Sequence, residues 1–223
     1  MKTNEVPLVV VSSPETNITD LIIDRVNKDP KLALMSKQTS PGVWEDVTAE
    51  DYLAEVRALA KGFVASGIEV GQRVGIMSAT RYEWALTDFA LWFAGAVSVP
   101  IYESSAPSQI EWILSDSGAV AAIFENKTHF ELFKSVQKNL PAVKATWTFE
   151  GKDLADLVKL GKSVSDEELE KRRTSNGLKD LATIIYTSGT TGRPKGCELL
   201  HQGFVDLCRN AQAVLPEVVA PGG

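Results

Sequence analysis

Between residues 73 and 149, short apolar runs alternate with longer amphipathic stretches, and this alternation constrains the fold more than any other feature. Short apolar runs bounded by turn residues are typical of buried strands, and the stretches between them have helical spacing. The predicted strands are residues 73–78, 97–101, 119–124 and 144–149, and the predicted helices are residues 81–94, 107–116 and 127–139. Strands joined through helices form a mostly parallel sheet. The sequence therefore predicts an α/β fold, with a parallel-rich sheet and helices on both faces.

The flanking segments carry turn and helix-capping signals. Further predicted elements are a hairpin of residues 32–36 and 43–47, a strand over residues 181–186, and helices over residues 153–160 and 202–214. Side chains that accept hydrogen bonds from free N–H groups mark the starts of helices. The expected caps are Asn17 or Thr16 for residues 18–26, Thr48 for a helix that ends at Gly67, Ser104 or Ser105 for residues 107–116, and Ser165 for residues 166–173.

Composition limits the classes of partner. With 223 residues, of which 44% are hydrophobic, the chain is long enough to bury a sizeable core. Its formal net charge is −6, and no long Lys/Arg-rich segment exists to neutralise a phosphate backbone, so we expect no nucleic-acid partner. The one basic cluster, Lys171-Arg172-Arg173, ends an acidic helix and is expected to lie on a solvated helix face. The sequence leaves the oligomeric state open.

No segment is typical of a membrane span or a secretory signal. The longest apolar region, residues 89–102, is broken by Gly95, Ser98 and Pro100 and is shorter than the ~20 residues of a spanning helix. The two cysteines and two histidines are too few and too far apart for a disulfide framework or a metal site. We therefore expect a cytoplasmic protein without an integral membrane segment.

One segment concentrates groups that bind anions. Residues 186–196 have the sequence YTSGTTGRPKG and directly follow the apolar run 181–185. Glycines let backbone N–H groups approach an anion closely, hydroxyls donate hydrogen bonds, and Lys195 adds positive charge. A glycine-rich surface turn would explain the glycines but not the hydroxyls and the lysine. The sequence therefore predicts a phosphate loop at the end of a buried strand.

This loop differs from the Walker phosphate loop, which ends in Gly-Lys-Ser/Thr and opens a helix. Here Lys195 lies between Pro194 and Gly196, and no hydroxyl residue follows it. Pro194 also disfavours a helical conformation at Arg193. We therefore expect the loop to connect two strands, and the Gly-x-Gly-x-x-Gly dinucleotide fingerprint is absent as well.

The sequence YTSGTTGRPKG resembles, position by position, the signature loop of the adenylate-forming enzymes, which include acyl-CoA synthetases, peptide-synthetase adenylation domains and firefly luciferase. Residues 78–84 (SATRYEW) and 95–105 (GAVSVPIYESS) are similar to segments of the long-chain fatty acyl-CoA synthetases. In that family the loop grips the β- and γ-phosphates of ATP. Arg193 is left out of the expected site because its side chain can point to solvent. The resemblance implies that the triphosphate-binding residues are Thr187, Ser188, Gly189, Thr190, Thr191, Gly192 and Lys195.

The resemblance also implies a reaction. A fatty acid, expected to be long-chain, attacks ATP to form an acyl-adenylate, and coenzyme A then takes the acyl group. The implied cofactors are ATP, Mg²⁺ and coenzyme A. The family's magnesium, ribose and adenylation residues are expected beyond residue 223, so we predict no catalytic residue and no metal ligand in this chain.

The final residues, APGG, are typical of a turn, and the sequence ends there, which predicts a chain cut inside a larger protein. We expect residues 1–15 to form an N-terminal arm that gains order by docking. Residues 16–223 are expected to form part of an N-terminal adenylation domain, truncated at its C-terminal end and inactive alone. The alternatives are a non-catalytic nucleotide-binding module and an ATP hydrolase.

Three further features have structural interpretations. His201 follows the loop without an evident nucleophile or carboxylate partner, so we expect a structural histidine. The apolar flank of Cys197 predicts a buried packing residue. Glu103 is a candidate for the border of a substrate entrance. The helical spacing of one aromatic run predicts core packing, and its members are Trp84, Phe89, Trp92 and Phe93.

Overall fold

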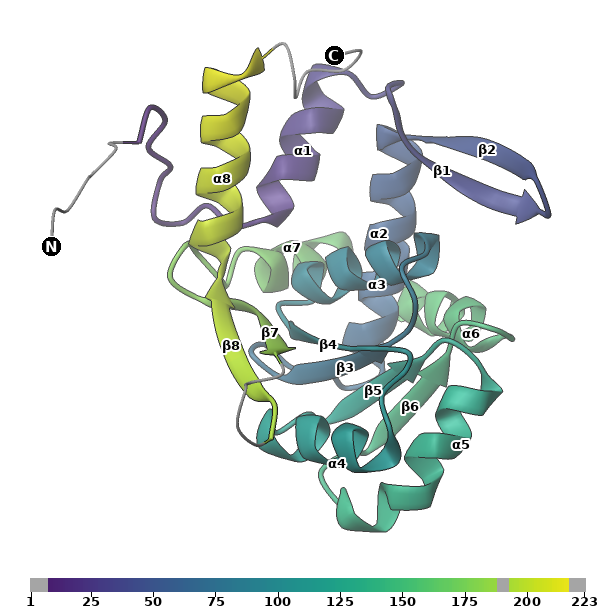
Figure 1. The fold of residues 1–223 in the computed structure, drawn as a ribbon. Coiled ribbons are helices and arrows are strands. Elements are labelled where there is room, and N and C mark those ends of the chain that lie inside the picture. Colours follow the sequence, from purple (N-terminus) through teal and green to yellow (C-terminus); the bar gives the residue numbers. More distant parts are fainter. Residues whose placement is uncertain (1–7, 188–192, 217–223) are drawn as a thin grey trace, which may run out of the picture.

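The computed structural model describes residues 8–187 and 193–216, and its centre is a six-stranded sheet (Figure 1). The strand order is β6-β5-β3-β4-β7-β8, and all neighbours are parallel except β7 and β8, which are antiparallel. The strands are β3 (Arg73–Met77), β4 (Val97–Ile101), β5 (Ala121–Phe124), β6 (Ala145–Thr148), β7 (Leu181–Thr187) and β8 (Lys195–Leu200). The predicted parallel-rich α/β sheet is confirmed.

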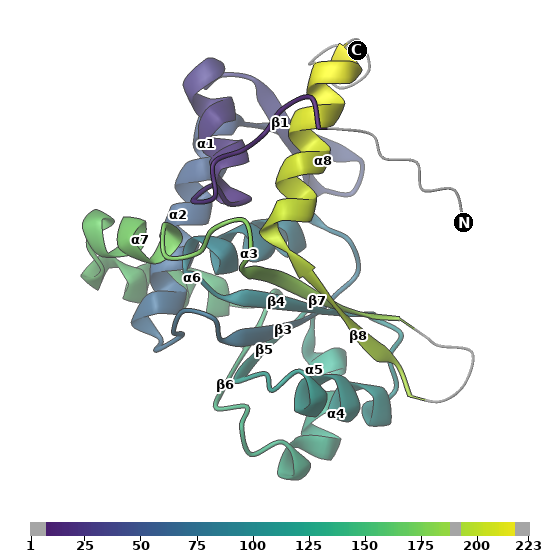
Figure 2. The same cartoon turned by 90° about the vertical axis from the view of Figure 1, so that its left-hand side faces the viewer.

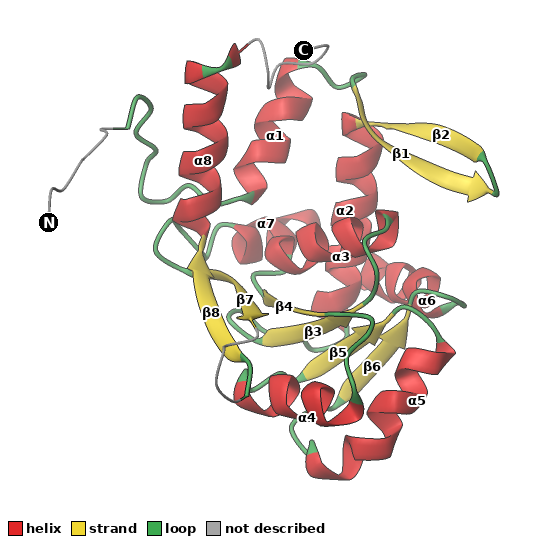
Figure 3. Ribbon diagram, viewed as in Figure 1, coloured by secondary structure: helices red, strands yellow, loops and turns green. Residues whose placement is uncertain are grey.

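Helices cover both faces of this sheet (Figure 3). One face is covered by α2 (Ala49–Ala65), α3 (Tyr82–Phe93), α6 (Asp153–Leu160) and α7 (Asp166–Arg173), and the other by α4 (Pro107–Asp116) and α5 (Lys127–Val136). Side chains alternate between the faces of a strand, and on β3 Val74 and Ile76 belong to the first core while Met77 belongs to the second. Each face of the sheet therefore has its own hydrophobic core. No helix in the described part of the chain is both long and apolar enough to cross a membrane.

The second core holds α4 close against the sheet. Ile110 and Leu114 of α4 are buried in it. A Cβ atom at Gly75 of β3 would lie 2.6 Å from Cδ2 of Leu114, nearer than non-bonded carbon atoms tolerate. Glycine at this position therefore permits the close approach of the helix, and α4 is fixed relative to the strands.

The remaining elements lie beyond α2 and α3. They are α1 (Thr19–Lys28), the hairpin of β1 (Ala33–Ser40) and β2 (Val43–Thr48), and α8 (His201–Val214). The segment that begins at residue 8 runs beside α8 (Figure 2). There the side-chain oxygen of Asn210 accepts hydrogen bonds from the N–H groups of Val9 and Val10, at 2.7 and 3.0 Å. The hairpin is confirmed, and the extent of the arm over residues 1–15 stays a prediction because residues 1–7 lie outside the described residues.

Two predicted caps are confirmed. The hydroxyl of Thr48 accepts a hydrogen bond from the N–H of Asp51 at 3.2 Å, and that of Ser165 accepts one from Glu168 at 3.1 Å. Both hydroxyls satisfy an N–H group that the helix itself leaves without a partner.

One predicted cap is wrong, and another lies one residue before the N-cap of its helix. Neither Ser104 nor Ser105 opens α4, whose N-cap is Ala106, and the side chain of Gln109 accepts a hydrogen bond from the Ala106 N–H at 2.9 Å. Ile18 precedes α1 as its N-cap, one residue after Asn17. The side-chain oxygen of Asn17 still accepts a hydrogen bond from the Thr19 N–H. Its amide NH₂ group donates to the carbonyl oxygen of Arg173 at the end of α7. At α4 the side chain of Gln109 replaces the predicted serine caps, whereas at α1 Asn17 still satisfies an N–H group of the first turn.

Candidate phosphate-binding site

The predicted phosphate loop connects β7 to β8, as the sequence indicates. Thr187 and Lys195 pair directly across the two antiparallel strands, and Tyr186 pairs with Gly196 beside them. Residues directly opposite in antiparallel strands project to the same face. Two of the predicted site residues are thus brought together at the mouth of the loop. The other five, Ser188, Gly189, Thr190, Thr191 and Gly192, lie outside the described residues.

The mouth of the loop is solvent-exposed at both of these residues. Thr187 and Lys195 are exposed, and within the described residues Lys195 makes no ion pair. A long flexible cation without a protein partner is available to an anionic ligand. The hydroxyl of Thr187 adds a hydrogen-bond donor on the same face.

Tyr186 has the opposite orientation and lies against α4. Its side chain is buried, and its hydroxyl donates a 2.6 Å hydrogen bond to Oδ2 of Asp116. Burial and the Asp116 carboxylate raise the pKa of Tyr186, so the phenol stays protonated. Gly196 leaves room for this ring, since a Cβ atom there would lie 3.1 Å from its Cζ atom.

The strand after the loop is held by the same helix. The indole N–H of Trp112 donates a 2.8 Å hydrogen bond to the carbonyl oxygen of Pro194. The guanidinium of Arg193 lies over the Trp112 ring, 4.7 Å from its centroid. Arg193 therefore stacks on an indole within a cation–π geometry while staying exposed.

A cavity of about 340 Å³ lies next to the loop, at the carboxyl ends of β3, β4 and β7. The chain leaves β3 toward α3 on one face and leaves β4 toward α4 on the other, and such switch points form crevices in open α/β sheets. Its lining residues are Ser78, Thr80, Trp84, Pro100, Ile101, Tyr102, Glu103, Ile185 and Tyr186. Glu103 lines this cavity, and its place at the border of a substrate entrance stays a prediction. The sequence did not single out Ser78, Thr80 or Tyr102 as cavity residues, although all three lie at or just after the ends of adjacent predicted strands.

Comparisons with known proteins identify the family of this chain. The profile described as AMP-binding enzyme matches residues 24–220, which is most of the chain. The chain belongs to the AMP-binding enzyme family. Two relatives are the long-chain-fatty-acid–CoA ligases FadD15 of Mycobacterium bovis and Mycobacterium tuberculosis, 37% and 36% identical over the whole of this chain. The chain spans 37% of the length of each of these relatives.

Solved structures show the same fold. A long-chain-fatty-acid–CoA ligase (FadD1) from Archaeoglobus fulgidus superposes with a TM-score of 0.76 at 21% identity, over 96% of this chain and 42% of that one. The inhibitor-bound N-terminal domain of FACL13 from Mycobacterium tuberculosis gives a TM-score of 0.68 at 25% identity, over 83% of this chain and 44% of that one. The sheet and its helices therefore form the α/β architecture found in N-terminal domains of adenylate-forming enzymes.

The predictions for Cys197 and for the aromatic run have opposite outcomes in this member of the AMP-binding enzyme family. Cys197 is exposed, so the prediction of a buried packing residue is wrong. It lies on β8, an edge strand of the described sheet with β7 as its one neighbour, and its side of the strand is left uncovered. The core interpretation of the aromatic run is confirmed, because Trp92 and Phe93 are buried and Trp84 and Phe89 pack against the same core.

His201 is a buried structural histidine, as predicted. It begins α8, its Nδ1 accepts a 3.4 Å hydrogen bond from the Ile18 N–H, and its Nε2 has no partner among the described residues. Burial lowers the pKa of His201 to about 4, against the opposite influence of Asp180 and Asp20. The ring therefore stays neutral in the folded protein at pH 7.

This depressed pKa predicts a loss of stability in mild acid. The ordinary pKa of a histidine is 6.5, and that of buried His201 is about 4. Between these two pH values His201 binds a proton in the unfolded chain but not in the folded protein, so the free energy of unfolding falls as the pH falls. We expect the free energy of unfolding to drop by about 2–3 kcal/mol between pH 7 and pH 4.5 on account of this group. Chemical denaturation across this pH range measures it.

A His201→Gln variant should lose that part of the pH dependence. His129→Gln is the matched control, because His129 is the other histidine of the chain, and this variant should keep the wild-type dependence. Equal pH profiles for wild type and His201→Gln would contradict the assignment.

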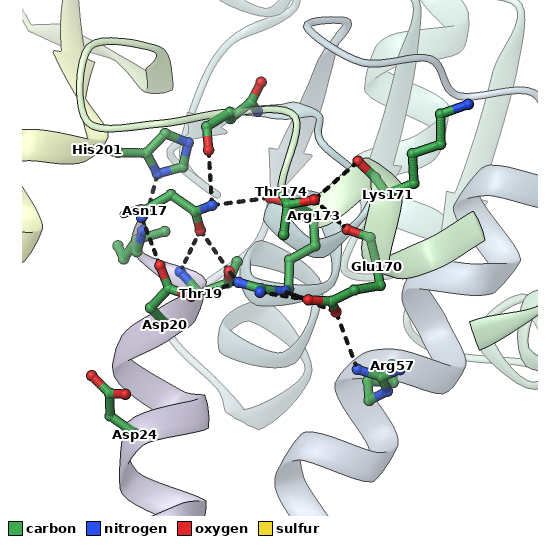
Figure 4. Close-up of polar contacts among 12 residues, drawn as sticks. Asn17, Thr19, Asp20, Asp24, Arg57, Glu170, Lys171, Arg173, Thr174 and His201 are labelled. Carbon is green, nitrogen blue, oxygen red and sulfur yellow. Dashed lines mark hydrogen bonds and ion pairs between the residues drawn. The ribbon is translucent and has the colours of Figure 1, made fainter. Parts of the chain in front are cut away.

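The basic cluster of α7 is not simply solvated, which corrects the prediction of a solvated helix face. The side chain of Arg173 is only 9% exposed and forms ion pairs with Asp20 of α1 and Glu170 of α7, both at 2.6 Å (Figure 4). It also donates a hydrogen bond to the Thr19 hydroxyl at 2.9 Å. In the same network the Asn17 amide donates to the Arg173 carbonyl oxygen at 2.9 Å. Arg173 therefore joins α7 to α1, a contact between distant parts of the chain.

Proposed function

We propose that the whole protein activates a long-chain fatty acid with ATP, first to an acyl-adenylate and then to acyl-CoA. The observation that carries the proposal is the pairing of Thr187 with Lys195 at the mouth of the loop of residues 186–196, in a chain of the AMP-binding family. The proposed triphosphate-binding set is Thr187, Ser188, Gly189, Thr190, Thr191, Gly192 and Lys195. Of this set, two members are described and share one face of the hairpin.

The chemistry of adenylation suits this loop. When a carboxylate oxygen attacks the α-phosphorus of ATP, the bond to the bridging oxygen breaks and pyrophosphate leaves. Negative charge grows on pyrophosphate in the transition state, so a cation and hydrogen-bond donors around it stabilise the transition state more than the ground state. Lys195 would supply the cation, and Thr187 one of the donors.

The substrates are proposed from the relatives. The curated relatives named above are called long-chain-fatty-acid–CoA ligases, which supports a long-chain fatty acid, ATP and coenzyme A as ligands. Magnesium, which the family implies, would offset phosphate charge. Among residues 8–187 and 193–216, no group of three or more His, Cys, Asp or Glu side chains is placed to hold a metal ion. The free, exposed thiols of Cys197 and Cys208 agree with the reducing cytoplasm proposed as its location.

Fatty-acid-dependent pyrophosphate exchange tests the proposed function. With full-length protein, ATP, magnesium and labelled pyrophosphate, label should enter ATP only when palmitate is added. Steady phosphate release without exchange would instead favour an ATP hydrolase, and neither reaction would favour a nucleotide-binding module. We further propose that residues 1–223 alone are inactive, so acyl-CoA formation by the isolated chain would contradict that proposal.

A further inference from the structure

We propose that α4 anchors both strands of the phosphate-loop hairpin, and that Trp112 and Asp116 are positioning residues for the triphosphate-binding face. The inference rests on the proposed function for its ligand, ATP, but its structural part concerns contacts that exist without ligand. Trp112 and Asp116 are four residues apart on α4, and residues at this spacing lie on one face of a helix. From that face they reach the two sides of the same loop.

The first anchor is the contact of Asp116 with the strand that enters the loop. Its carboxylate accepts the 2.6 Å hydrogen bond of Tyr186, which is the residue directly before Thr187. The Tyr186 side chain fills the second core together with Leu114 and Ile184. Because Tyr186 projects toward α4, the adjacent Thr187 projects away from it.

The second anchor is the contact of Trp112 with the strand that leaves the loop. Its N–H holds the carbonyl of Pro194, the residue directly before Lys195, at 2.8 Å, and its ring lies under the Arg193 guanidinium. Proline has no N–H of its own to fix this position in the sheet. The indole therefore tethers the chain directly before β8 through the Pro194 carbonyl.

The two anchors act together because α4 is itself fixed. Its apolar side packs on the sheet, and the contact of Leu114 with Gly75 leaves no space for the helix to shift inward. Tyr186 and Pro194 are thus tied to one rigid element, one on each side of the loop. This arrangement sets the separation and the direction of Thr187 and Lys195. Since misplacement of binding groups by about 1 Å can cost 100-fold in rate, loss of an anchor should weaken ATP use.

The test measures fatty-acid-dependent adenylation by full-length protein. Trp112→Leu removes both contacts of the indole, with the Pro194 carbonyl and with the Arg193 guanidinium. This variant and Asp116→Ala should each lower kcat/KM for ATP by about tenfold to 100-fold. The KM for the fatty acid should stay within about twofold, because only ATP meets the loop in this proposal. Asp116→Asn, which keeps a hydrogen-bond acceptor, should recover most of the loss.

Glu111→Gln is the matched control on α4, since Glu111 makes no hydrogen bond or ion pair within the described residues, and it should behave as wild type.

A double-mutant cycle separates positioning from general damage. Tyr186→Phe and Asp116→Ala remove the same hydrogen bond, so their combined effect should be about that of one of them alone. Additive losses, or unchanged ATP kinetics in folded Trp112→Leu and Asp116→Ala, would overturn the proposal. Should Trp112→Leu fail to fold, Trp112→Phe removes the indole N–H while keeping an aromatic ring, and it should still lower kcat/KM for ATP. Unchanged kcat/KM in this variant would count against the anchor.

A second readout does not depend on the reaction. Hydrogen exchange of the β7 and β8 amides should be faster in Trp112→Phe and Tyr186→Phe than in wild type or Glu111→Gln, because each change removes one tether. If the wild-type enzyme shows no pyrophosphate exchange while these amides respond as expected, the proposed function fails and the anchor stands. Unchanged hydrogen exchange in both variants would overturn the anchor even in an active enzyme.

Discussion

Lys195→Ala in the full-length protein is expected to lower kcat/KM for ATP in adenylation by about 100-fold. Lys195 is the lysine of the loop, and its charge would face the pyrophosphate that leaves, where negative charge grows in the transition state. Removing one donor that stabilises a developing anion typically costs about 100- to 1,000-fold in rate. Fatty-acid-dependent pyrophosphate exchange at varied ATP concentration measures the effect.

Two variants sharpen this experiment. Lys195→Arg keeps the charge but replaces a compact ammonium by a planar guanidinium, so partial activity is expected. Lys179→Ala is the matched control, since Lys179 is also exposed and lies just before β7, outside the loop. Unchanged ATP kinetics in Lys195→Ala would remove Lys195 from the proposed triphosphate-binding set.

Arg173→Met is expected to lower the free energy of unfolding by about 3 kcal/mol. Removing one partner of a buried ion pair leaves the others without compensation, which typically costs about 3–5 kcal/mol. Asp20 and Glu170 would lose the guanidinium that joins them, and the low end applies because both carboxylates keep some contact with solvent. Equilibrium unfolding in urea, followed by circular dichroism, measures the change.

The same helix offers the comparison for this variant. Lys171 of α7 is exposed, so Lys171→Met should change stability by less than about 0.5 kcal/mol. Arg173→Lys should fall between, because an ammonium cannot present the guanidinium's several N–H groups to three acceptors at once. A stability of Arg173→Met equal to that of Lys171→Met would show that the network contributes nothing.

Local sequence signals were sufficient to predict the helices and strands. The apolar runs and helical spacings between residues 73 and 149 predicted each strand and helix there to within a few residues. Thr48 and Ser165 cap their helices because the groups they satisfy lie three residues away. Pro194 predicted a strand-to-strand connection because its ring restricts the residue beside it. Each of these causes acts over a short stretch of chain.

Burial of single side chains was less predictable. Cys197 has apolar neighbours in sequence, yet it is exposed because β8 lies at the edge of the described sheet. Arg173 belongs to a charged helix end, yet it is buried because Thr19 and Asp20 at the start of α1 contact its guanidinium. Whether a residue is covered depends on which element lies next to it, and sequence spacing does not give that order.

By itself the sequence determined the α/β class, the hairpin that carries the phosphate loop and, through its resemblance, the family of AMP-binding enzymes. The groups that hold that hairpin come from distant parts of the chain and are brought to it by folding. Trp112 and Pro194 are 82 residues apart, Asp116 and Tyr186 are 70 apart, and Asp20 and Arg173 are 153 apart. Contacts over such separations depend on the order of strands in the sheet and on the faces that the helices cover. Local propensities act over a few residues and leave that order open.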